Sequence, residues 1–193
     1  MRRHRDEFGK YRVKTAMKIL VGMSGGVDST VTAAILKEQG HDVVGAMMTV
    51  WGGEYSTPVK KHACYGPDEA EDFAEAAAAA EAIGIPFYRF HFADAYREIV
   101  VEDFRSEYLS ARTPNPCVRC NQRLKFGLLP DAAKREGIAF DLFATGHYSR
   151  IERDGCRFFL RKGMDALKDQ SYFLYRLTQE QLADKMNCNF KTI

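Results

Sequence analysis

The stretch that decides the fold reads LVGMSGGVDSTVTAAIL and runs from residue 20 to residue 36. An apolar run predicts a buried strand at 18–23, and helical periodicity predicts a helix at 29–39. Between them lies the polar hexapeptide SGGVDS, at 24–29. Small residues let the backbone of such a loop approach a ligand closely, and the amides that open the helix favour an anion. The stretch therefore predicts the first unit of an α/β fold with an anion site after its strand.

Further strands and helices alternate along the rest of the chain. Short apolar runs predict three more strands, and helical periodicity predicts three more helices, followed by a hairpin that turns at Asp154-Gly155. We therefore expect an α/β fold built on a doubly wound parallel sheet, with ligands at the carboxyl ends of its strands. The expected strands are 42–50, 85–92 and 141–148, the helices 67–84, 95–111 and 123–136, and the hairpin 150–163.

Composition narrows the function classes only in part. The chain has 193 residues, of which 46% are hydrophobic and 28% charged, as in an ordinary soluble globular protein. A net charge of +2 neither establishes nor excludes a nucleic-acid partner. No apolar stretch approaches the roughly 18 residues of a membrane span, so no membrane partner is expected. Five cysteines without an export signal indicate a reducing, cytoplasmic setting, where thiol chemistry or a metal site is favoured over structural disulfides.

The hexapeptide differs from the common phosphate-binding loops. It lacks the Lys-Ser/Thr pair of the Walker loop and the further spaced glycine of the dinucleotide fingerprint. Asp28 would repel a phosphate unless a divalent cation lay between them, so we expect it to contact Mg²⁺ bound to a polyphosphate. The alternative is a tight Gly-Gly turn that only begins a helix.

The residues Ser24 to Ser29, following a buried strand, resemble the pyrophosphate loop (PP-loop) of the ATP-pyrophosphatase superfamily. This resemblance implies an adenine nucleotide alpha hydrolase-like fold and an activity that splits ATP to adenylate a substrate oxygen. Three later segments indicate which family of this superfamily the chain resembles. They are TPNPCVRCNQRLKFG (113–127), DLFATGHYSRI (141–151) and LKDQSYFLYRL (167–177). Together they resemble the tRNA-specific 2-thiouridylases, over about residues 17–185, which implies replacement of the C2 oxygen of the tRNA wobble uridine by sulfur.

The resemblance implies a set of residues that contact ATP. Met48 could instead be a core methionine, and His147 could contact a phosphate or have a structural role. The implied ATP contacts are Gly22, Met23, Ser24, Gly25, Gly26, Val27, Asp28, Ser29, Met48 and Gly146.

The same resemblance makes Cys120 the catalytic nucleophile, carrying sulfur as a persulfide from a sulfur-donor protein. Thiolation and ATP use belong together because the C2 oxygen leaves only after activation as an adenylate. In a proline-rich loop leading into a helix, amide dipoles and Arg119 or Arg123 could lower the pKa of the Cys120 thiol. Asn115, Pro116 and Cys117 correspond to the stretch that contacts the target base.

Position 117 departs from the family pattern, because many members have aspartate where this chain has Cys117. The pair with Cys120 could be redox active, could ligate a metal or an iron-sulfur cluster, or could place a spare thiol beside the nucleophile. Zinc is disfavoured, since His62 and Cys64 are the only other candidate ligand cluster. Cys156 and Cys188 have no assigned role.

Two segments are expected to contact tRNA. Lys168, Asp169 and Gln170 match a tRNA-contacting stretch of the family, although a solvated surface loop is the simpler interpretation. Basic residues beside the cysteine pair would contact RNA phosphates. These are Arg112, Arg119, Arg123 and Lys125.

The domain organisation follows from the same comparison with the family. We expect a flexible leader at 1–16, the ATP-binding, adenylating domain at 17–150, and the incomplete start of a central tRNA-binding domain at 151–193. The second sulfur-handling cysteine of the family would lie beyond residue 193, so we expect the chain alone to adenylate but to complete sulfur transfer poorly. The alternatives are another PP-loop ATP pyrophosphatase, of the amidotransferase-coupled type, and a non-catalytic tRNA-binding fragment.

Overall fold

The computed structural model describes residues 16–53 and 66–183. His62, Cys64, Cys188 and all but the last residue of the predicted leader lie outside these ranges. Within the described ranges, no helix is both long and apolar enough to cross a membrane.

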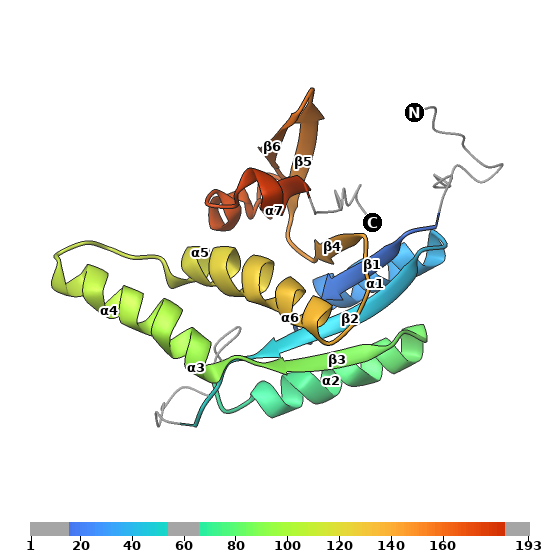
Figure 1. Ribbon diagram of the computed structural model, residues 1–193, viewed down its shortest axis with the longest axis horizontal. Coiled ribbons are helices and arrows are strands. Elements are labelled where there is room, and N and C mark those ends of the chain that lie inside the picture. The colour runs from blue at the N-terminus through green and yellow to red at the C-terminus, as the bar shows by residue number, and fades with distance from the viewer. Residues whose placement is uncertain (1–15, 54–65, 184–193) are drawn as a thin grey trace.

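A four-stranded parallel sheet forms the centre of the molecule (Figure 1). Its order is β3-β2-β1-β4, so the chain runs outward on one side of β1 and then crosses to β4 on the other side. Gly22, at the end of β1, lies opposite Ala46 of β2 and Thr145 of β4. The order therefore reverses between β1 and β4, where open α/β sheets bind their ligands. The strands are β1 (Lys18–Gly22), β2 (Asp42–Thr49), β3 (Phe87–His91) and β4 (Leu142–Thr145).

Helices cover both faces of this sheet. Successive residues of a strand point to opposite faces, so the buried strands present apolar side chains on each side. Ile19 and Val21 of β1 pack in the core with α1 (Val27–Glu38) and α2 (Glu69–Ile83), whereas Leu20 packs on the other face with Phe126, Leu129 and Phe143. Figure 1 shows α2 on one side of the sheet and the helix from α5 to α6 on the other. The predicted doubly wound α/β fold is confirmed.

The second face is covered by two long helical segments, each with a more widely wound π-type centre. The first comprises α3 (Ala93–Tyr96), η1 (Arg97–Val101) and α4 (Glu102–Leu109), where a single helix at 95–111 was expected. The second comprises α5 (Pro116–Cys120), η2 (Asn121–Leu128) and α6 (Leu129–Arg135). They pack together through Val100 and Leu124.

The start of the second segment corrects a sequence prediction. The helix expected from residue 123 begins at Pro116, so both cysteines of the pair lie on its first turns and not in a loop. The Asn115 side chain caps it, because its oxygen accepts hydrogen bonds from the backbone N–H groups of Cys117, at 3.0 Å, and Val118, at 3.4 Å. Proline lacks the backbone N–H that would be left unpaired in the first turn of a helix. The pair Asn115-Pro116 therefore marks a helix start that hydrophobic periodicity alone does not reveal.

A buried carboxyl group fixes the loop that follows β2. Glu69, 8% exposed at the start of α2, accepts hydrogen bonds from the backbone N–H of Val50, at 2.5 Å, and of Trp51, at 3.1 Å. Burial raises the pKa of Glu69, and the two backbone hydrogen bonds partly oppose that rise. This contact ties the end of β2 to the following helix.

The predicted hairpin is confirmed as a separate two-stranded antiparallel sheet of β5 (Ser149–Asp154) and β6 (Arg157–Lys162). It turns at Gly155 and Cys156, with Gly155 at a φ of 58°. The short helices η3 (Ser171–Leu174) and α7 (Gln179–Ala183) follow.

Side-chain amides fasten η2 to this last part of the chain. Asn121 donates to the carbonyl of Phe173 at 3.3 Å, and Gln122 donates to that of Arg176 at 2.8 Å. Gln181 donates in return to the carbonyls of Gln122, at 2.8 Å, and Phe126, at 3.0 Å. The helix that carries the cysteine pair is thus held by residues more than 50 positions later in the sequence.

Candidate functional site

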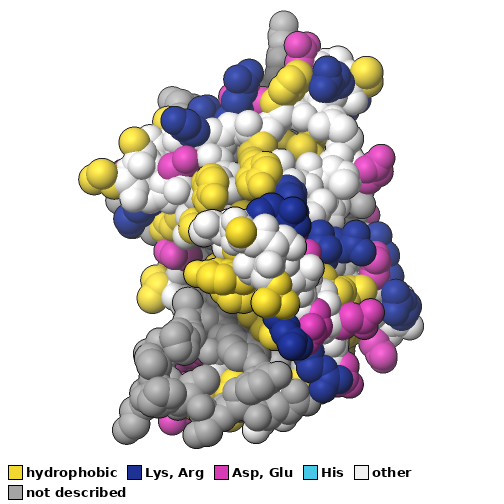
Figure 2. Space-filling model, turned by 90° about the vertical axis from the view of Figure 1, so that its left-hand side faces the viewer, with side chains coloured by type: hydrophobic (Ala, Val, Ile, Leu, Met, Phe, Trp, Pro, Cys, Tyr) yellow, Lys and Arg dark blue, Asp and Glu magenta, His cyan; other side chains and the backbone are white. Residues whose placement is uncertain are grey.

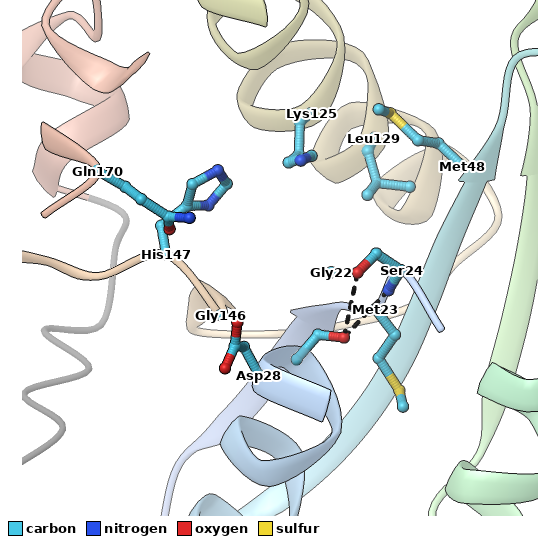
Figure 3. Close-up of a pocket in the computed structure, with 11 residues that line it drawn as sticks. Gly22, Met23, Ser24, Asp28, Met48, Lys125, Leu129, Gly146, His147 and Gln170 are labelled. Atoms are coloured by element: carbon cyan, nitrogen blue, oxygen red, sulfur yellow. Dashed lines mark hydrogen bonds between the residues drawn. The ribbon is translucent and has the colours of Figure 1, made fainter. Parts of the chain in front are cut away.

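A cavity of about 220 Å³ opens at the carboxyl ends of β1 and β4, where the strand order reverses (Figure 3). Typical ligand pockets span roughly 300 to 1,000 Å³, so a nucleotide would fill the cavity and extend beyond it. The loop after β1, the end of β4 and the η2–α6 helix contribute to its walls. Its lining residues are Gly22, Met23, Ser24, Asp28, Ser29, Met48, Lys125, Leu129, Gly146, His147 and Gln170.

The loop after β1 is held by its own serines. The Ser29 hydroxyl accepts a hydrogen bond from the Ser24 backbone N–H, at 3.1 Å, and donates to the carbonyl of Gly26, at 3.0 Å. Gly25 has a φ of 78°, and a Cβ there would lie 2.7 Å from the backbone oxygen of Asp72. No side chain caps α1 at Gly26, so its first amides, which lack partners within the helix, stay open to an anion.

Gly146 brings the second predicted segment against this loop. A Cβ at this position would lie 2.7 Å from the backbone nitrogen of Ser29 and 2.8 Å from the carbonyl carbon of Asp28. The end of β4 therefore touches the first turn of α1, and only glycine fits that contact. The structure brings together seven residues of the predicted ATP set, whereas Gly25, Gly26 and Val27 do not line the cavity.

Asp28 has a partner that the sequence did not reveal. Its Oδ1 accepts a hydrogen bond from the Tyr148 hydroxyl at 2.7 Å, and this bond raises the pKa of Tyr148. The Lys168 amine lies 5.3 Å from the centre of the Tyr148 ring. Among the described lining residues Asp28 is the only carboxylate. Mg²⁺ commonly takes one or two carboxylates together with substrate phosphates, so Asp28 suits an ion that arrives with a nucleotide.

Two further residues of the cavity have contrasting electrostatics. Lys125 projects from η2 into the cavity (Figure 3), although the sequence grouped it with the RNA-contacting residues. His147 Nδ1 lies 2.8 Å from the Thr145 hydroxyl, and burial lowers the pKa of His147 to about 3, with the Lys125 charge acting in the same direction. His147 is therefore neutral near pH 7, and Lys125 carries the positive charge. In the sequence, Lys125 lies four positions from each of the buried residues Asn121 and Leu129, and this helical spacing could have predicted that Lys125 faces inward.

The cysteine pair lies outside this cavity. Cys117 is exposed, and Cys120 is half-buried beside Val50, Val100 and Leu124. Neither thiol lines the cavity, so the predicted nucleophile does not meet the phosphate loop directly in this conformation.

The described residues do not supply a complete metal site around these thiols. No group of three or more potential ligands occurs within 16–53 and 66–183. Iron-sulfur clusters usually take four cysteine thiolates. Cys156, the other described cysteine, is exposed at the tip of the hairpin. The described part of the chain therefore does not fit the predicted cluster by itself.

Two of the cations predicted to contact RNA already have carboxylate partners. Arg119 pairs with Asp103 at 3.2 Å, and Arg112 pairs with Glu107 at 2.6 Å. Figure 2, which views the end of the molecule bearing α4 and the start of α5, shows Lys and Arg interspersed with acidic and apolar side chains. The surface near Cys117 is mixed in charge.

The predicted tRNA-contacting stretch reaches the cavity through one member. Gln170 lines it, and its side-chain oxygen accepts a hydrogen bond from the Tyr148 backbone N–H at 3.0 Å. Asp169 accepts from the backbone N–H groups of Gly163, at 2.7 Å, and Ser171, at 3.2 Å, so its carboxylate shapes the loop. Lys168 is exposed.

A family model described as "tRNA methyl transferase HUP domain" matches residues 17–189. The chain is 53% identical to the tRNA-specific 2-thiouridylase MnmA of Geobacter metallireducens, covering 88% of this chain and 46% of that protein. It is 47% identical to the MnmA of Endomicrobium trichonymphae, covering 89% of this chain and 49% of that protein.

The chain thus spans about half the length of the curated relatives it matches. A solved structure, the U34-tRNA thiolase NcsA of Methanococcus maripaludis with its 4Fe-4S cluster, is 23% identical, with a TM-score of 0.45. That match covers 69% of this chain and 39% of the other.

Proposed function

This chain belongs to the family of the tRNA methyl transferase HUP domain, and on that premise we propose that it takes part in ATP-dependent 2-thiolation of the tRNA wobble uridine. The C2 oxygen of the uridine attacks the α-phosphorus of ATP, and the bond to the β-phosphate breaks to release pyrophosphate. Sulfur then bonds to C2 as the carbon–oxygen bond breaks and AMP leaves. The adenylation step is the part that the cavity would perform.

The observation that carries this proposal is the meeting of the phosphate loop with Gly146 at the reversal of strand order. Open amides of α1 and the hydroxyl of Ser24 would bind the pyrophosphate, and Ser29, whose hydroxyl donates to the carbonyl of Gly26, would hold the loop in place. Met48 would contact the adenine, and Asp28 would hold Mg²⁺ through the phosphates. The bound metal would neutralise charge on the departing pyrophosphate.

The sulfur step is assigned to the helix that begins at Pro116. Cys120 would carry a persulfide received from a sulfur-donor protein, and its terminal sulfur would attack C2. Cys117, one turn away on the same helix, could then attack the sulfur of Cys120 and release the thiolated uridine, leaving a disulfide for an external thiol to reduce. Asn115 and Pro116 would contact the target base at the same helix start.

The tRNA would be held by residues at the edge of the cavity. Lys168, Asp169 and Gln170 form the loop proposed to contact it, and Gln170 joins this loop to the nucleotide site. The proposed tRNA substrate would place the reaction in the cytoplasm.

Exchange of radioactive pyrophosphate into ATP tests the adenylation step. The 193-residue chain should catalyse exchange that depends on unmodified tRNA, because adenylation is reversible before sulfur attacks. Asp28→Asn should abolish exchange, whereas Asp131→Asn, an exposed substitution on α6, should not change it. Exchange stimulated by a small carboxylic acid in place of tRNA would contradict the proposal, as would tRNA binding with no exchange under any condition.

A further inference from the structure

Lys125 is the feature of the cavity that the functional assignment leaves unexplained. It comes from η2, on the opposite side of the cavity from the phosphate loop (Figure 3). The family resemblance does not include Lys125 among the implied ATP contacts, and its expected role was to contact RNA phosphates.

The side chain of Lys125 makes no hydrogen bond or ion pair with any residue in the described ranges, although it is half-buried. Withdrawing an ammonium group from water is unfavourable unless an anion compensates it. Asp28, the one carboxylate of the described lining, already accepts a hydrogen bond from Tyr148. His147 is neutral and offers no competing charge. Asp28 keeps its negative charge, but Lys125 has no ion-pair partner within the described ranges, and an anionic ligand beside it would supply one.

The position of Lys125 indicates which anionic group that is. On its own helix, Leu129 lies one turn further along, and Met48 of β2 lies beside Leu129, which together make the apolar end of the cavity (Figure 3). Ser24 and the first turn of α1 make the opposite, anion-binding end. A nucleotide with its base at the apolar end and its pyrophosphate on the loop has its α-phosphate between them.

We propose that Lys125 binds the α-phosphate of the nucleotide and is a catalytic residue of adenylation. The assignment rests on the proposed function, because it takes the bound nucleotide from there. Attack on the α-phosphorus adds negative charge to its non-bridging oxygens, and an ammonium group in a partly desolvated site stabilises that charge more strongly than water does.

The same residue links the two halves of the reaction. Lys125 follows Cys120 by five positions on one continuous helical segment, from α5 into η2. Contact between Lys125 and the nucleotide therefore positions the helix that presents the cysteine pair.

Calorimetric titration of the 193-residue chain with ATP, AMP and adenosine tests the assignment. AMP and adenosine differ by the α-phosphate alone, so their affinity ratio isolates its contribution. Lys125→Gln should weaken AMP binding about tenfold or more, as expected for loss of a charge-assisted hydrogen bond, and should leave adenosine unchanged. Lys125→Arg should restore part of the AMP affinity. Arg135→Gln, an exposed basic residue at the end of α6 on the same helical segment, is the matched control and should bind like the wild type.

The outcomes separate this inference from the function on which it rests. A wild-type chain that binds neither ATP nor AMP refutes the proposed function. A wild-type chain that binds ATP, with AMP affinity unaltered in Lys125→Gln, refutes the role of Lys125 alone. Equal weakening of AMP and adenosine would show that Lys125 only supports the cavity wall, and would also overturn the assignment.

Discussion

Replacing Gly146 with alanine should damage the candidate site through backbone contact alone. The added Cβ would lie 2.7 Å from the backbone nitrogen of Ser29 and 2.8 Å from the carbonyl carbon of Asp28. Both neighbours are backbone atoms of the first turn of α1, so no side chain can rotate away to relieve the overlap. The end of β4 and the start of α1 must separate by several tenths of an ångström.

The size of the effect follows from the cost of overpacking, which is typically about 1 to 3 kcal/mol. For a chain of this length, each kcal/mol lowers the melting temperature by roughly 2 to 4 °C. The separation also displaces the amides that would bind phosphate, and a misplacement of about 1 Å can reduce activity on the order of a hundredfold. Urea denaturation measures the first effect, and ATP titration the second.

Gly26→Ala is the matched control within the same loop. A Cβ there would meet only the Ser24 hydroxyl, at 3.5 Å, which is an ordinary contact. We expect this variant to keep its stability, because the added methyl group meets no backbone atom within 4 Å. A Gly146→Ala protein with the unfolding midpoint and ATP affinity of the wild type would refute the steric reasoning.

Three further predictions concern the core and the buried titratable groups. Phe143→Ala should lower the free energy of unfolding by about 3 to 5 kcal/mol in urea denaturation, because the Phe143 side chain is fully buried against Phe126. Glu69→Ala should cost about 1 to 3 kcal/mol in the same assay, because the buried N–H of Val50 loses its acceptor, and Glu69→Gln, which keeps an acceptor, should cost less. Below pH 6.5 the unfolded chain protonates His147 whereas the folded chain, with a pKa of about 3, does not. The free energy of unfolding should therefore decrease as the pH is lowered, by up to about 1.4 kcal/mol per pH unit. A His147→Asn variant whose free energy of unfolding has the same pH dependence as the wild type between pH 6.5 and about 4 would contradict this.

The parallel sheet could be predicted because its determinants are local. The apolar run at Ile19 to Val21 is bounded by a turn, and glycines or prolines bound the other strands, so each expected strand includes the observed one. The repeated alternation of strand and helix then implied parallel pairing and a site at the carboxyl ends. The loop at Ser24 to Ser29 and Gly146 were expected at one edge of the sheet because each follows a strand, and the structure brings them into contact.

The remaining parts of the site depend on contacts between distant segments. Asp28 and Tyr148 are 120 positions apart, and no local pattern indicates that a tyrosine hydroxyl meets that carboxylate. Lys125 was grouped with the RNA-contacting residues because it lies near the cysteine pair in the sequence, and the structure places it in the wall of the cavity. Once the helix begins at Pro116, its periodicity turns Lys125 toward the sheet with Asn121 and Leu129.

The hydrogen bonds from side-chain amides that fasten η2 to the last part of the chain also limit when this helix can be anchored during synthesis. The strands β1, β2 and β3 are complete by residue 91. The helix that carries Cys120 and Lys125 acquires its anchors only when Phe173, Arg176 and Gln181 have been synthesised. A chain synthesised only as far as residue 172 would therefore lack all three anchors of this helix.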